Sequence, residues 1–79
     1  MIEKVLIKMM WEKVRDLPKD SQWREFTGIL EFRGARFLMR CDFKMKPDAL
    51  EIDKININEY MGEINKNNDH KVIPVCRMN

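Results

Sequence analysis

The segment from Phe26 to Met45, FTGILEFRGARFLMRCDFKM, decides the fold of this chain. Apolar and polar side chains alternate on both sides of Gly34-Ala35, which is the pattern of two antiparallel strands joined by a tight turn. The apolar members of this alternation, with two more from the segment that follows, form the expected buried face: Phe26, Leu30, Phe32, Phe37, Met39, Cys41, Phe43, Leu50 and Ile52.

Two registers of this hairpin fit the pattern. A two-residue loop at Arg33-Gly34 pairs Leu30 with Phe37, whereas a four-residue loop from Arg33 to Arg36 pairs Phe32 with Phe37. Because the two registers differ by two residues, both place the same side chains on the buried face.

Residues 2–17, which precede the hairpin, repeat apolar side chains at the period of an α-helix and carry charges on the opposite side. Leu17-Pro18 ends this predicted helix, because the residue before a proline disfavours helical dihedral angles. The apolar arc spans about 200°, wider than the roughly 100° that is needed to cover a sheet. The excess width comes from Ile7, Trp11 and Val14.

The residues after the hairpin predict three more elements. Alternation of apolar and polar residues at Ala49–Asp53 indicates a third strand, with Leu50 and Ile52 facing inward. Asn56 followed by Glu59 resembles a capping box that opens a short helix at about 57–66. A last strand is expected around Val72–Cys76, and its proline restricts it to a sheet edge.

Together these elements predict one α+β domain over residues 1–79, with the order α-β-β-β-α-β. A single small antiparallel sheet of three to four strands would pack on two helices. A chain of 79 residues leaves no room for a second domain.

The charge balance is only mildly basic, with 15 basic against 13 acidic residues. This excess is smaller than that of a dedicated nucleic-acid-binding protein. No uninterrupted apolar run is long enough for a secretory signal or a membrane span, and two cysteines are too few for a disulfide framework. We therefore expect a cytoplasmic protein without a membrane partner.

The residues that could carry chemistry are isolated from one another. His70 lies beside a polar turn, the carboxylates are scattered singly, and no glycine-rich phosphate loop is present. Cys41, Cys76 and His70 supply too few ligands for a standard zinc site, although they leave a redox or metal sensor as a minor alternative. We expect no catalytic residue, no metal and no cofactor.

The first candidate binding surface is the extra width of the helical arc. Trp11, with Ile7 and Val14 beside it, has the composition of an interface anchor for a partner protein or for a second copy of the chain. The alternative is that the domain wraps this helix more deeply, with Trp23 from the following loop packed on it.

The second candidate surface is the outer face of the hairpin, residues 24–46. Cations at alternate strand positions repeat at about 7 Å, which is comparable to phosphate spacing in a nucleic acid. Glu31 and Asp42 interrupt this stripe, so a solvated, self-neutralising face is the simpler interpretation. The cations are Arg33, Arg36, Arg40, Lys44 and Lys46.

The sequence favours a small non-enzymatic protein-binding module, an inhibitor or regulator that docks sterically on another protein through Ile7, Trp11 and Val14. Its Lys-, Asn-, Ile- and Met-rich composition suits a phage-encoded or bacterial accessory protein. The alternative is a nucleic-acid-binding protein that uses the basic outer face of the 24–46 hairpin.

Overall fold

The computed structural model describes residues 2–59, 62–65 and 70–78, and in these ranges the chain forms one α-helix and one antiparallel sheet of five strands. The predicted α+β class is therefore confirmed. In chain order the elements are α1 (Ile2–Val14), β1 (Trp23–Phe32), β2 (Ala35–Met45), β3 (Ala49–Glu59), β4 (Gly62–Asn65), β5 (Lys71–Pro74) and a 3-10 helix, η1 (Val75–Arg77).

The β1–β2 hairpin has the register of the two-residue loop. Leu30 lies opposite Phe37, and Phe32 lies opposite Ala35 across the turn. Arg33 and Gly34 have φ angles of 53° and 81°, as expected for the type I′ turn that matches the twist of the strands. The register with a four-residue loop is wrong.

A bulge in β3 changes which residues face the helix. Arg40 pairs with Asn56 and Asp42 pairs with Asp53, so the two residues Lys54 and Ile55 lie opposite Cys41 alone. Lys54 takes up the extra length with a φ of 55°. Because the extra residue shifts the alternation, four side chains of β3 reach the core from both sides of the bulge: Leu50, Ile52, Ile55 and Ile57.

The helix predicted at about 57–66 is wrong where the structure describes it. β3 continues to Glu59, and Gly62–Asn65 forms β4, which pairs with β3. The physical reason is that Ile55 and Ile57 are β-branched residues that alternate with polar ones, and pairing with β2 buries both. Residues 60, 61 and 66 of the predicted helix lie outside the described residues.

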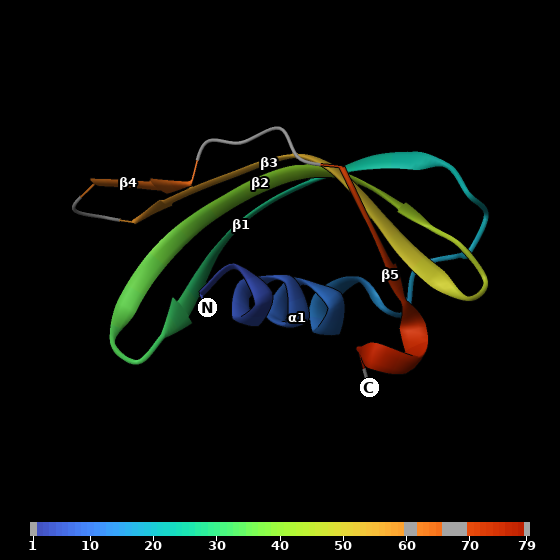
Figure 1. Cartoon of the computed structure of the whole chain (residues 1–79), viewed down its shortest axis with the longest axis horizontal. Helices are drawn as coiled ribbons and strands as arrows, with labels where there is room; N and C mark the ends of the chain where they lie inside the picture. Colours follow the sequence, from blue (N-terminus) through green and yellow to red (C-terminus); the bar gives the residue numbers. More distant parts are fainter. Residues whose placement is uncertain (1, 60–61, 66–69, 79) are drawn as a thin grey trace.

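The sheet arches over α1 (Figure 1). β3 pairs with β2 along one side, and on its other side it pairs with β4 and β5 near its two ends. The core lies between α1 and the concave face of the sheet, where Leu6 and Met10 are fully buried. Every residue predicted to face inward is buried or partly buried against this core.

The predicted bounds of the terminal elements need small corrections. α1 ends at Val14 instead of Leu17, and the Leu17 amide donates to the Val14 carbonyl in a turn before Pro18. The last strand is Lys71–Pro74, and among the described residues it pairs only with β3, so its edge position is as predicted. None of the described helices is long and apolar enough to cross a membrane.

Candidate functional site

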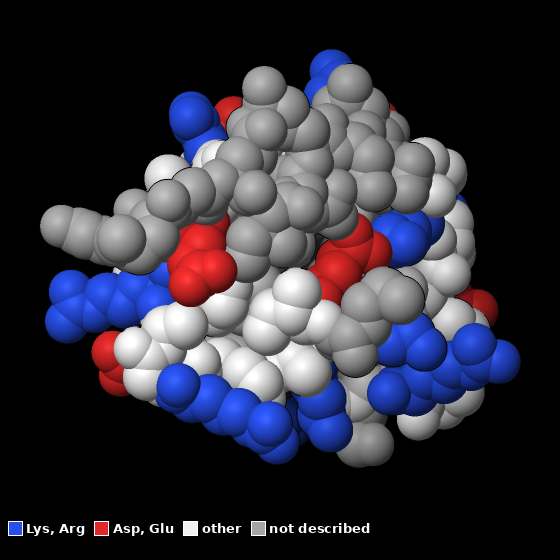
Figure 2. Space-filling view, turned by 60° about the vertical axis from the view of Figure 1, so that its left-hand side comes forward, with Lys and Arg blue, Asp and Glu red and all other residues white. Residues whose placement is uncertain are grey.

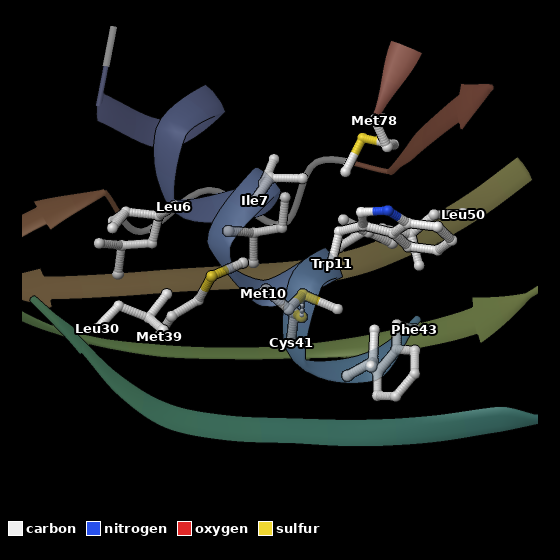
Figure 3. Packing of buried hydrophobic residues seen from close by; sticks show 14 of the residues in the cluster. Leu6, Ile7, Met10, Trp11, Leu30, Met39, Cys41, Phe43, Leu50 and Met78 are labelled. Carbon is white, nitrogen blue, oxygen red and sulfur yellow. Dashed lines mark hydrogen bonds between the residues drawn. The ribbon is translucent and has the colours of Figure 1, made fainter. Parts of the chain in front are cut away.

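The apolar arc of α1 lies inside the domain. Ile7, Trp11 and Val14, the three predicted interface residues, are only 4%, 3% and 6% exposed. Trp11 belongs to the same buried cluster as Leu50 of β3 and Met78 (Figure 3). A curved sheet encloses more of a helix than a flat one, and this accounts for the width of the arc. In this conformation Trp11 and Val14 do not form a surface, and Ile7 contributes only to the lining of a groove beside α1.

Trp23 is placed differently from the prediction. It begins β1 on the outer face of the sheet, where it is 49% exposed and lies opposite Lys44. The Lys44 ammonium is 4.6 Å from the centre of its ring, within the range of a cation–π interaction. Trp23 is therefore an outward-facing aromatic residue of the hairpin, not a cover for α1.

The five cations of the predicted nucleic-acid surface do not form one continuous surface of unpaired positive charge. Arg36 pairs with Glu31 at 3.5 Å, Lys46 pairs with Glu51 at 2.9 Å, and Arg33 lies over the ring of Phe32. On the face seen in Figure 2, Lys and Arg side chains are spread around the margin and acidic side chains lie between them. Arg40 is exposed on β2, and Lys44 lies 4.0 Å from Glu51.

Glu51 is the centre of a charge cluster on the outer face, with Lys44, Lys46 and His70 around it. Its residue is 9% exposed, and its carboxylate contacts the Lys46 ammonium at 2.9 Å and His70 Nε2 at 2.5 Å. The hydrogen bond from Lys46, with that from His70, lowers the pKa of Glu51 to about 2. The cluster joins β2, β3 and the start of β5, so it stabilises the sheet instead of presenting free charge.

The thiols and the histidine are held in different environments. Cys41 is buried and contacts Met10, whereas Cys76 is exposed on η1, and neither forms a disulfide. Burial, with the neighbouring Asp42 charge, raises the pKa of the Cys41 thiol to about 12, so it stays protonated and unreactive. His70 is engaged with Glu51. Among the described residues, no cluster of His, Cys, Asp or Glu could hold a metal ion.

An open groove lies between the N-terminal half of α1 and the β5–η1 segment. Its volume is about 660 Å³, which falls within the range of ligand-binding pockets. The described residues that line it are Glu3, Lys4, Ile7, Lys8, Lys71, Val72, Ile73, Arg77 and Met78. Ile7 and Met78, which are almost fully buried, and the partly buried Ile73 give it an apolar component.

The charges around this groove are unequal. Its described lining contains four cations and one carboxylate, and that carboxylate, Glu3, pairs with Lys71 at 3.1 Å. Lys4, Lys8 and Arg77 are exposed. An apolar base beside several exposed cations suits a ligand that is both anionic and partly apolar.

Sequence reasoning missed this groove. The available signal was the spacing of Lys4 and Lys8, which are four residues apart and therefore lie on one side of a helix. No local pattern indicated that Lys71 and Arg77 would lie opposite them, because that position depends on the pairing of β5 with β3.

Comparison with protein-family models, with curated proteins and with solved structures gives no match to this chain.

Proposed function

We propose that this chain is a non-enzymatic protein-binding module that takes an acidic, partly apolar segment of a partner protein into the groove between α1 and β5–η1. Docking there would inhibit or regulate the partner sterically. The observation that carries the proposal is the groove itself, whose described lining places four cations and one carboxylate around apolar side chains.

The form of the groove favours an extended peptide segment as its occupant. One wall is the helix and the other is β5, which among the described residues pairs only with β3. The groove is open, whereas small-molecule sites bury most of their ligand. An extended segment can lie along β5 with its apolar side chains toward Ile7 and Ile73 and its carboxylates beside Lys4, Lys8 and Arg77.

Nucleic-acid binding through Arg33, Arg36, Arg40, Lys44 and Lys46 is the alternative proposal. The observation in its favour is Trp23, an exposed ring next to Lys44 that could stack on a base. Against it, Glu31 and Glu51 neutralise several of these cations.

The test uses a short fluorescein-labelled peptide of alternating Glu and Leu as the probe, and fluorescence anisotropy as the readout. We expect this peptide to bind with an affinity that falls as salt is added, and the same peptide with Lys in place of Glu to bind far more weakly. Reversing two exposed cations of the groove, in K4E/K8E, should weaken binding by about tenfold or more, which corresponds to about 1.4 kcal/mol.

The matched control is K13E, which reverses an exposed lysine of the same helix outside the groove. It should change the affinity by less than about threefold. Equal effects of K4E/K8E and K13E, or equal binding of the acidic and basic peptides, would overturn the groove proposal. A single-stranded DNA oligonucleotide tested in parallel, with R36E/R40E as its variant, decides the alternative.

A further inference from the structure

β1 forms an open edge of the sheet. It is 10 residues long, and among the described residues it pairs only with β2. Phe32 and Ala35 close a two-residue turn, so the even-numbered residues of β1 direct their backbone groups toward β2. The backbone groups of Glu25, Thr27, Ile29 and Glu31 therefore point away from β2, toward the open edge.

The charged side chains that protect this edge lie near its two ends. Charged side chains, prolines and bulges normally keep an edge strand from pairing with another chain. Arg24, which pairs with Asp20 at 2.9 Å, provides such a charge at the beginning of β1. Glu31, which pairs with Arg36 at 3.5 Å, is a second charge near the end of β1. From Phe26 to Leu30 the strand has no charged residue, proline or bulge.

The exposed side chains of this stretch are apolar at its centre. Ile29 is 67% exposed, more than any other large hydrophobic residue in the described ranges. Its neighbour across the hairpin is Leu38, which is also exposed. An open backbone edge next to an apolar outer face has the two features that strand addition requires.

We propose that two copies of the chain pair through β1, antiparallel and about a two-fold axis, with Ile29 opposite Ile29 of the second copy. The two sheets then become one, with both helices on the same side. Pairing of Thr27 with Glu31 of the second copy completes about six backbone hydrogen bonds. The exposed Ile29 side chains cover each other, and Phe26 lies opposite Phe32 of the second copy.

The charges of Glu25, Glu31 and Arg33 favour this register over the two registers that are shifted by two residues. Glu25 lies opposite Asp42 within the hairpin, and the two like charges repel, although Asp42 also lies 4.0 Å from the Lys54 ammonium. In the proposed register Arg33 of the second copy lies next to Glu25 and offsets the charge of its carboxylate. Sliding one copy by two residues in one direction would instead place Glu25 opposite Glu31 of the second copy, and sliding it in the other would remove the contact between Glu25 and Arg33.

The first test is the oligomeric state of the full chain, measured by size-exclusion chromatography with light scattering across a range of concentrations. We expect a dimer that dissociates on dilution. I29K should be monomeric at the same concentrations, because it places a charge on the edge, whereas L38K, on the same face but on the inner strand β2, should still dimerise. Circular dichroism of each variant checks that the fold is kept.

The second test examines the register. E25R should weaken dimerisation by about tenfold or more, and E25R/R33E should restore it, because the double variant exchanges the two charges without removing their attraction. In a C76S background, I29C should form a disulfide-linked dimer under mild oxidation, since paired residues in this geometry have Cα atoms about 5.5 Å apart. T27C should not.

Several outcomes would overturn the inference. A wild-type chain that stays monomeric at every concentration rules out self-pairing, and a dimer that survives I29K but is lost in L38K places the interface elsewhere. Cross-linking of T27C in preference to I29C, or no recovery in E25R/R33E, rules out the register. The groove variant K4E/K8E lies on a different surface and should leave the dimer unchanged, so this inference and the proposed function fail separately.

Discussion

Two single-residue deletions at the bulge of β3 test how that strand presents its side chains. Deleting Lys54 leaves one residue opposite Cys41, and the alternation then places Ile55 and Ile57 on the core side as before. Deleting Ile55 also leaves one residue there, but that residue is Lys54, which would enter the row of side chains that faces α1.

The difference in stability between the two deletion variants can be estimated from the burial of Ile55. Ile55 is fully buried, and burial of such a side chain contributes about 1.5–3 kcal/mol. Turning a lysine toward the core adds at least about 1 kcal/mol. The loss of the bulge is common to both variants, so we expect the Ile55 deletion to be less stable by about 3 kcal/mol. A domain of this size has a total stability of about 4–12 kcal/mol.

Urea unfolding followed by tryptophan fluorescence gives both stabilities on one scale. The Lys54 deletion should unfold cooperatively with a slope close to that of the wild type, and the Ile55 deletion should have a much lower midpoint or be unfolded without urea. Equal stabilities, or a Lys54 deletion that is the more damaging of the two, would refute the pairing of Lys54 and Ile55 with Cys41.

Three further predictions concern single side chains. K54G should raise the free energy of unfolding by about 0.5–1 kcal/mol, because Lys54 has a φ of 55°, and K54V should lower it; a gain for K54V in urea unfolding would contradict the bulge. Iodoacetamide should modify Cys76 of the native chain once by intact mass, and Cys41 only in denaturant, since burial raises the pKa of Cys41 to about 12; two rapid additions would contradict that burial. The pKa of Glu51 is lowered from 4.5 to about 2, so between these two pH values the unfolded chain binds more protons than the folded chain. The contribution of Glu51 to stability should therefore be lost as the pH falls from about 5 toward 2. E51Q should flatten that part of the pH profile of thermal unfolding, and an unchanged profile would contradict the cluster.

The hairpin could be predicted from the sequence because its determinants are local. The period-two pattern assigned the two faces of β1 and β2, and Gly34 marked the turn. The choice between two registers needed the structure, since both placed the same side chains inward. The two-residue turn at Arg33-Gly34 is the one that matches the twist of the strands.

The second half of the sheet could not be predicted in the same way. The bulge at Lys54 interrupts the alternation, so a count by twos from Ile52 misses Ile55 and Ile57. Asn56 and Glu59 then resembled a helix start, but pairing with β2 is a long-range interaction that outweighs a local capping signal.

The candidate sites were harder to predict, because both depend on the shape of the sheet. The width of the apolar arc was recognised in the sequence, but whether Trp11 lay inside or outside depended on the curvature of strands at least 12 residues away. The groove joins Lys4 and Lys8 to Lys71 and Arg77, at opposite ends of the chain. No local pattern relates segments so far apart.

The environment of Trp11 tests whether the sheet encloses the apolar arc of α1, on which the choice of the groove and the β1 edge as the proposed binding surfaces depends. The measurement is acrylamide quenching of two variants that each keep one tryptophan, W23F and W11F. Trp11 in W23F should emit at short wavelength and resist quenching, whereas Trp23 in W11F should emit at longer wavelength and be quenched readily. Quenching of Trp11 as readily as of Trp23 would show that the sheet does not enclose α1.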